Sequence, residues 1–422
     1  MNVLWFCNMA PPEASVLLNE PVSPFGGWFV NASRLLCLNE SVRLTIAFPK
    51  RGITDLVQVR GEKITYIAFP IATSQRDYIR CKECIGKVLS CVKPDITQVF
   101  GTEYLHSLAV MELCNPDRTV IHIQGLVSVY QQHYFASLPS RVINRYTLRD
   151  VVKNDNILKQ QKKMRALGEH EIRALKLAKH VIGRTAWDYA CVKRINSNIK
   201  YHLGNEILRE EFYHHSWDIT KINKFSIFVS QGSGSIKGLH ILLEAMPDII
   251  KRFPHAVLSV GGHNMTKTES GIINRMKISS YGKYLKELIR RYRLEEKVVF
   301  LGLLDEQQMC ERYLQSHVFV MPSAIENSPN SLGEAMILGV PCVASDVGGI
   351  SSLIKHGEEG FVYPFDEPYM LAHYVCEVFG NNELASAFSR STVKHASNTH
   401  DPQENISTLL QIYKTIILGD QE

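Results

Sequence analysis

The chain of 422 residues is too long for one ordinary hydrophobic core, so two domains of roughly 200 residues each are expected. Hydrophobic residues make up 45% and charged residues 21%, which is typical of a globular enzyme and not of a disordered or membrane-embedded chain. No uncharged apolar run reaches about 18 residues, so we expect no transmembrane helix. The net charge of +5 is too small to indicate nucleic-acid binding.

Features that indicate a cellular location are few. The N-terminal segment MNVLWFCNMAPPEAS has no basic residues before its short apolar stretch, so it predicts a first β-strand and not a signal peptide. Ten cysteines are scattered along the chain, and the one close pair, Cys81 and Cys84, lacks the second pair that a zinc site requires. We interpret the pair as reduced thiols on or near a helix, with a metal or redox role as the alternative. A cytoplasmic location is expected.

A local basic run, KQQKKMR, extends from Lys159 to Arg165. Such a run fits peripheral contact with the inner membrane surface or with an anionic acceptor. The alternative interpretation is a solvated helix face.

Short strand-like runs alternate with helical patterns in both halves of the chain. The runs are rich in β-branched and aromatic residues and are bounded by turn-forming residues. In the first half they are Val3–Cys7, Val42–Phe48, Ile64–Phe69, Ile96–Gly101, Thr119–Gly125 and His180–Thr185, with helical patterns at Asp77–Cys91 and Glu169–Lys179. In the second half they are Phe225–Ser230, Ala256–Gly262, Lys297–Gly302, His317–Pro322, Pro341–Ser345 and Gly360–Pro364. This alternation predicts an α/β protein with two Rossmann-like, doubly wound sheets.

We expect an N-terminal domain over residues 1–204, a linker over 205–224 and a C-terminal domain over 225–395. Residues 396–422, with an amphipathic pattern over Asn405–Ile417, predict a C-terminal helix that packs back on the first domain. Two such domains would face each other across a cleft lined by the carboxyl ends of their strands, where this architecture binds ligands.

The segment MPSAIENSPNSLGEAMILG predicts a strand, a loop that carries Glu326, and a helix that ends at Gly339. Ser and Asn near the start suit helix capping, and Pro suits the first turn. The positive end of such a helix attracts phosphate, and a carboxylate accepts two hydroxyl hydrogens at once. The candidate ligand-binding residues here are Glu326, Asn330, Ser331, Leu332 and Glu334. The alternatives are an exposed loop acid at Glu326 and a dipole-stabilising acid at Glu334.

The segment FSIFVSQGSGSIKG predicts a strand that runs into a glycine- and serine-rich turn before a helix. Small residues let backbone amides approach a phosphate, and Lys237 adds a positive charge. The order Lys237–Gly238 does not satisfy the Walker A pattern. A surface lysine at a helix start is the alternative.

Two glycine pairs and one pair of polar residues complete the candidates. Gly348 and Gly349 follow a strand and permit an amide nest or a plain turn. In the first domain Gly26 and Gly27 would let the backbone approach a phosphate or an acceptor, unless they form an ordinary loop. His122 and Gln124 share one face at the end of a strand; a buried core histidine is the alternative for His122, and Gln124 is the better site candidate.

Together these residues resemble the family 4 glycosyltransferases, most clearly from Phe225 to Pro364. Members carry two glutamates eight positions apart, matched by Glu326 and Glu334, a Lys-Gly pair at the start of a helix, matched by Lys237 and Gly238, and a glycine turn, matched by Val343, Gly348 and Gly349. The resemblance implies the GT-B fold, no metal or other cofactor, and retaining transfer of a hexose from a nucleotide-diphosphate sugar. It implies that Glu334 holds the ribose, Glu326 the hexose and Lys237 the diphosphate.

The chain departs from the family at two places. Gln231 and Gly232 stand where members carry a diphosphate-binding arginine, so backbone amides, Gln231 or an arginine such as Arg184 would take that role. Gln124 stands where members commonly have a histidine, with His122 two residues earlier. The acceptor implied is a carbohydrate or a lipid-linked intermediate in surface polysaccharide or glycolipid biosynthesis.

Other functions are disfavoured or kept as alternatives. No Asp-x-Asp or G-x-S-x-G pattern occurs, and no G-x-G-x-x-G follows the first strand, so hydride transfer and serine hydrolysis are disfavoured. One alternative is a nucleotide-sugar-binding protein that is catalytically weak or inactive. The other is a glycosidase that uses Glu326 and Glu334 as its carboxylate pair.

Overall fold

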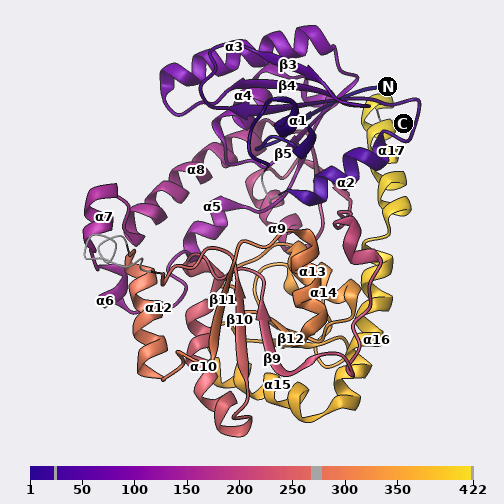
Figure 1. Cartoon of the computed structure of the whole chain (residues 1–422). Helices are drawn as coiled ribbons and strands as arrows, with labels where there is room; N and C mark the ends of the chain where they lie inside the picture. Colours follow the sequence, from indigo (N-terminus) through magenta and orange to yellow (C-terminus); the bar gives the residue numbers. More distant parts are fainter. Residues whose placement is uncertain (23–25, 268–277, 420–422) are drawn as a thin grey trace. The chain divides into compact units, whose positions relative to one another are not determined.

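The computed structural model describes residues 1–22, 26–267 and 278–419. The chain forms two compact units, each built around one sheet (Figure 1). Unit 1 comprises Met1–Val129, Arg165–Arg209 and His400–Glu422, and unit 2 comprises Tyr130–Met164 and Glu210–Thr399. The segment Tyr130–Met164 thus belongs to the unit of the second sheet, which a single boundary near residue 204 does not anticipate.

The sheet of unit 1 has eight strands in the order β3-β4-β2-β1-β5-β6-β7-β8. They are β1 (Asn2–Phe6), β2 (Arg43–Lys50), β3 (Val57–Arg60), β4 (Thr65–Pro70), β5 (Ile96–Phe100), β6 (Thr119–His122), β7 (His180–Gly183) and β8 (Lys200–Leu203). All neighbours pair in parallel except β3 and β4. The edge strands β3 and β8 are not predicted from the sequence, because they are short and about half of their residues are polar.

Helices cover both faces of this sheet. They are α1 (Pro12–Leu17), α2 (Gly27–Leu36), α3 (Gln75–Val92), α4 (Leu105–Leu113), α5 (Val127–Tyr130), the later part of α8 (Ile157–Leu177), α9 (Ala186–Ile195) and α17 (Pro402–Leu418). One core cluster joins the sheet to α3, α4, α8 and α9, and the other joins it to α2 and α17. Figure 1 shows α17, in yellow, beside α2. Its Tyr413 is fully buried and accepts a hydrogen bond from Trp5 Nε1 at 2.9 Å.

The sheet of unit 2 has six parallel strands in the order β11-β10-β9-β12-β13-β14. They are β9 (Asn223–Val229), β10 (Val257–Gly261), β11 (Val298–Gly302), β12 (Ser316–Met321), β13 (Cys342–Ser345) and β14 (Phe361–Tyr363). The strand order reverses between β9 and β12. Open α/β sheets bind ligands outside the carboxyl ends of the strands at such a switch point.

The helices of unit 2 connect these strands and extend into the segment before α8. They are α6 (Ser140–Ile143), α7 (Leu148–Lys153), α10 (Leu239–Arg252), α12 (Ser280–Arg291), α13 (Glu306–Gln315), α14 (Asn330–Leu338), α15 (Pro368–Gly380) and α16 (Asn382–Thr399). Asp305 caps α13 through Gln308 N at 2.8 Å, as its position before an amphipathic pattern requires. The prediction of two Rossmann-like, doubly wound sheets is confirmed.

The cysteines are free thiols. Cys81 and Cys84 are buried on α3, and burial raises the pKa of Cys81 to about 12, so that thiol stays protonated. Across residues 1–22, 26–267 and 278–419, no helix is both long and apolar enough to cross a membrane. The same residues contain no cluster of three or more His, Cys, Asp or Glu side chains placed to hold a metal ion.

Candidate functional site

The loop after β9 is shaped by glycines. Gly234 has φ of +90° and Gly238 has φ of +67°, and between them Ser235–Lys237 form a single 3-10 turn. A Cβ atom on Gly238 would lie 1.5 Å from the backbone oxygen of Pro322, directly after β12. Glycine is therefore required beside Lys237, because the loop packs backbone to backbone against the neighbouring strand end.

Lys237 and Glu326 form an ion pair at the switch point of unit 2. Lys237 Nζ lies 2.6 Å from Glu326 Oε1, and the two side chains are 36% and 9% exposed. Ser323 Oγ donates to the same carboxylate oxygen at 2.8 Å. The ammonium group has three protons, so it can bind an anionic ligand while it remains paired with Glu326. The structure thus brings together the two residues to which the family resemblance assigns the diphosphate and the hexose, and which we expect to be catalytic.

The glycine turn after β13 contacts the same glutamate. Gly349 N donates to the backbone oxygen of Glu326 at 3.0 Å. A Cβ atom on Gly348, whose φ is +55°, would lie 1.9 Å from that oxygen. Two loops, one after β9 and one after β13, therefore pack closely against the backbone of the loop that carries Glu326.

Helix α14 begins beside this loop. Pro329 is its N-cap residue and no side chain caps it, so Asn330 and Ser331 belong to the first turn and do not cap it. Both residues are half-buried, whereas Leu332 and Glu334 are buried. The first-turn amides and the helix dipole provide a site for an anion next to Glu326.

The positions where an arginine was expected lie on the inner side of the β9 loop. Gly232 N donates to the backbone oxygen of Gly261 at 3.0 Å, and a Cβ atom on Gly232 would meet the side chains of Val260 and Leu239. Gln231 is half-buried and lies next to Gly262. A large side chain at Gly232 would have to displace these neighbours.

In unit 1 the glycine pair precedes α2. Gly26 is its N-cap residue with φ of +82°. A Cβ atom on Gly27 would lie 2.7 Å from the side chain of Arg209. A ligand could reach this backbone only if nearby side chains such as Arg209 moved aside. The role of the glycine pair in ligand binding stays a prediction.

His122 and Gln124 both approach the carboxylate of Glu206, which lies in the segment predicted to be the linker. Gln124 Nε2 donates to Glu206 Oε1 at 2.7 Å, and His122 Nε2 lies 3.7 Å from the same oxygen. Arg184 Nη1 lies 2.8 Å from Glu206 Oε2, with both side chains almost fully buried. The guanidinium of Arg184 is thus bound within unit 1.

Burial governs the protonation of His122. Removal from water lowers the pKa of His122 to about 4, although the nearby Glu206 carboxylate opposes this shift. His122 is therefore neutral at pH 7. Its Nδ1 lies 3.1 Å from Gln98 Nε2, deep in the sheet.

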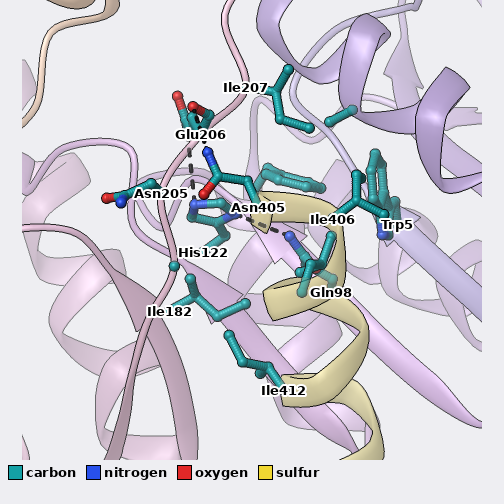
Figure 2. A pocket seen from close by; sticks show the side chains of 14 residues that line it. Trp5, Gln98, His122, Ile182, Asn205, Glu206, Ile207, Asn405, Ile406 and Ile412 are labelled. Carbon is teal, nitrogen blue, oxygen red and sulfur yellow. Dashed lines mark hydrogen bonds and ion pairs between the residues drawn. The ribbon is translucent and has the colours of Figure 1, made fainter. Parts of the chain in front are cut away.

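A cavity of about 30 Å³ adjoins this cluster (Figure 2). It is lined by Trp5, Ala32, Gln98, Phe100, His122, Ile182, Gly204, Asn205, Glu206, Ile207, Asn405, Ile406, Leu409 and Ile412. This volume holds about two water molecules and no sugar ring. A larger hollow of about 440 Å³ lies between α1, α2 and the start of β4, and none of the residues predicted for the site lines it.

The residues missed from the sequence are Gln98, Arg184 as an ion-pair partner, Glu206 and Tyr413. Glu206 lies in the segment after β8, and buried Ile207 and Leu208 come next, so an acid beside an apolar pair was the available signal. Gln98 offered no such signal in the sequence, because it lies inside the apolar strand β5.

The basic run predicted from the sequence lies on α8, where Lys162, Lys163 and Arg165 are exposed. Membrane contact at this run stays a prediction.

Comparisons with known proteins show a family resemblance in the second half of the chain. Residues 210–395 match the family model described as glycosyl transferases group 1. Spore coat protein SA of Bacillus subtilis is 26% identical over 193 residues, which cover 45% of this chain and 48% of that protein. Mannosylfructose-phosphate synthase of Agrobacterium fabrum is 32% identical over 134 residues, covering 31% of this chain and 28% of the relative. The matched segments thus span less than half the length of these relatives.

Solved structures resemble the chain over nearly its whole length. Sucrose-phosphate synthase from Thermosynechococcus elongatus has a TM-score of 0.70 at 14% identity, with 99% of each chain covered. Anabaena HepE in complex with UDP-glucose has a TM-score of 0.65 at 15% identity, covering 98% of this chain and all (100%) of that one. The two units therefore have the Rossmann-like fold of the GT-B glycosyltransferases. Residues 210–395 are thus similar to the glycosyl transferases group 1 family.

Proposed function

We propose that this protein is a retaining hexosyltransferase that needs no metal ion and moves a sugar from a nucleoside diphosphate to an acceptor hydroxyl. The observation that carries the proposal is the Lys237–Glu326 pair, 2.6 Å apart at the switch point of unit 2 and beside the start of α14. A cation and a hydroxyl-binding carboxylate held this close suit the junction between a phosphate and a sugar. The UDP-glucose complex of the similar Anabaena protein supports such a donor.

Each group at the site has a chemical role in this proposal. Lys237 and the first-turn amides of Asn330 and Ser331 bind the diphosphate, Glu326 binds hydroxyls of the hexose, and Glu334 binds the ribose. Gln231, Gly232 and Leu332 shape the donor site, and we also propose a donor-binding role for the Gly26–Gly27 backbone.

The reaction breaks the bond between the anomeric carbon and the diphosphate oxygen, and forms a bond to the acceptor oxygen on the same face. The acceptor hydroxyl gives its proton to the departing phosphate, which carries the bonding electron pair away. Lys237 stabilises the negative charge that grows on this phosphate, usually the largest contribution in such sites. We propose a carbohydrate or lipid-linked acceptor in surface polysaccharide or glycolipid biosynthesis.

The substitution Lys237→Ala tests this assignment. Loss of one preorganised charge at a leaving group lowers turnover by roughly 100- to 1000-fold, so we expect such a loss with UDP-glucose or whichever UDP-, GDP- or ADP-sugar binds best. Thermal-shift assays identify that donor, and product analysis measures transfer. Lys221→Ala is the matched control, because Lys221 is 80% exposed and pairs only with nearby Asp218 among the described residues. Unchanged turnover in a folded Lys237→Ala protein contradicts the proposal.

The second candidate is a nucleotide-sugar-binding protein without turnover. It is favoured by the absence of an arginine at Gln231 and Gly232, and by the engagement of Arg184 with Glu206. It predicts a donor-induced thermal shift in the wild-type protein with no product. A glycosidase would instead cleave glycosides without binding nucleotide in calorimetry.

A further inference from the structure

Three adjacent strands of unit 1 each end in a polar side chain of one buried cluster. Gln124 follows β6, Arg184 follows β7 and Glu206 follows β8, and these strands are neighbours in the sheet. Glu206 is the centre of the cluster, because one carboxylate oxygen accepts from Gln124 at 2.7 Å and the other lies 2.8 Å from Arg184. The side chains of Glu206 and Arg184 are 2% and 3% exposed, so the arrangement is enclosed.

A series of hydrogen bonds leads from Trp5 through Tyr413 and Gln98 to His122, and its direction follows from Trp5. Trp5 Nε1 can only donate, and it donates to Tyr413 Oη. The Tyr413 hydroxyl then donates to Gln98 Oε1. The Gln98 amide nitrogen is left to donate to His122 Nδ1.

The proton of the neutral His122 ring is therefore on Nε2, which faces Glu206. Arg184 also only donates, and an ionised carboxylate only accepts. Glu206 is thus the acceptor on which donors from β6 and β7 converge.

This polarity fixes the half-buried amide of Gln124. Because its nitrogen donates to Glu206, its carbonyl oxygen is the group that remains for a ligand, and within the described residues the amide makes one hydrogen bond. We propose that Glu206 is a positioning residue, which holds Gln124 so that the amide oxygen, a hydrogen-bond acceptor, remains for a hydroxyl of a carbohydrate ligand of unit 1. This inference rests on the proposed function, and it explains how glutamine can serve at a position where histidine is common in similar enzymes.

The substitution Glu206→Gln reverses this polarity while it keeps the size of the side chain. Arg184 can only donate, so the oxygen of the new amide turns toward Arg184 and its NH2 group toward Gln124. Two NH2 groups cannot bond to each other, so the Gln124 amide must rotate and present its nitrogen to the ligand. We expect turnover of UDP-glucose to fall about 10- to 100-fold, the effect of one mismatched hydrogen bond at a buried site. Binding of UDP alone should change less than about twofold, because the nucleotide is assigned to unit 2.

The double substitution Gln124→Glu with Glu206→Gln supplies the rescue. The amide at position 206 then donates to a carboxylate at position 124, whose second oxygen again presents an acceptor to the sugar. We expect this variant to recover most of the lost turnover, whereas Gln124→Glu alone places two carboxylates at hydrogen-bond distance and is impaired. Glu83→Gln, at an exposed position on α3, is the control for the loss of one negative charge.

A spectroscopic measurement decides the orientation independently of catalysis. In protein labelled with 15N-glutamine, the Gln124 NH2 resonances, assigned by comparison with Gln124→Met, should show slowed amide rotation and slowed solvent exchange. Glu206→Gln should remove both effects. Unchanged resonances, or a double variant that is folded yet as inactive as Glu206→Gln, overturn the inference. If wild-type protein neither binds nor turns over any nucleotide sugar, the proposed function fails, while the resonances still decide whether Glu206 orients Gln124.

Discussion

The two sheets position polar groups at their strand ends by different means. In unit 2 the loops after β9 and β13 use glycine backbone, and Gly238 and Gly348 pack directly against carbonyl oxygens beside the Lys237–Glu326 pair. In unit 1 the strand ends use side chains, with Gln124 and Arg184 bound to the buried Glu206. The position of the functional groups therefore depends on close backbone packing in unit 2 and on side-chain hydrogen bonds in unit 1.

The difference determines how each region responds to substitution. A glycine that touches backbone allows no side chain, because the opposing carbonyl cannot move without the strand. A buried polar cluster tolerates a change of group only if donors and acceptors still match. Unit 2 should thus be sensitive to size, and unit 1 to hydrogen-bond polarity and to pH.

Gly238→Ala should have the largest effect on stability. The new Cβ would lie 1.5 Å from the Pro322 oxygen at a backbone φ of +67°, so strand β12 or the Lys237 loop must shift. We expect about 4 kcal/mol or more of lost unfolding free energy, together with loss of turnover, measured by urea denaturation and product analysis.

Gly234→Ala is the matched control in the same loop. Its backbone, with φ of +90° and ψ of 152°, favours glycine, but no atom lies within 4 Å of the Cβ position, so only backbone strain of about 1–3 kcal/mol is expected. Equal losses in the two alanine variants would show that the contact with Pro322 is unimportant.

The unfolding free energy should also decrease with falling pH because of His122. Its pKa is about 4 in the folded protein and about 6.5 when unfolded, so below pH 6.5 the unfolded state binds the additional proton. The stabilisation by neutral His122 is complete above pH 6.5 and is lost as the pH falls through the window from 6.5 to 4. It corresponds to about 3 kcal/mol.

Denaturation curves at several pH values, for wild type and His122→Gln, isolate this contribution. The other buried histidines titrate in both proteins, so the difference between the curves belongs to His122. Parallel stability profiles for the two proteins would contradict the assignment.

Tyr413→Phe should have a smaller effect. It leaves Trp5 Nε1 and Gln98 Oε1 without their shared partner in a buried site, which costs about 1–3 kcal/mol. Tyr369→Phe, at a side chain that is 59% exposed, should be nearly neutral in the same denaturation assay. A loss below about 0.5 kcal/mol for Tyr413→Phe would mean that water replaces the hydroxyl.

The sequence predicts the sheets well because buried parallel strands are continuous apolar runs, as in β12 and β13. It fails for β3 and β8, which lie at sheet edges and carry polar residues. The sequence also does not predict that Tyr130–Met164 belongs to unit 2, because no local sequence pattern indicates which sheet a helix packs against.

Motifs of the site are predictable where they depend on local geometry. Lys237, Glu326 and the glycines lie in short segments whose spacing reflects loops and helix starts, so they can be identified without a structure. Glu206 meets Gln124 from 82 positions away, and Tyr413 meets Gln98 from 315 positions away. Such pairs have no spacing rule, and each residue alone is an ordinary glutamate or tyrosine.

The hydrogen bond between Trp5 and Tyr413 joins residues 408 positions apart. During synthesis the first strand of the chain must wait for the last helix before its core can close. Unit 2 ends at Thr399, so all of its residues have been made before α17 begins. Unit 1 is therefore completed only after unit 2 has been made, and its early β-strands must stay soluble on the ribosome without the cover of α17.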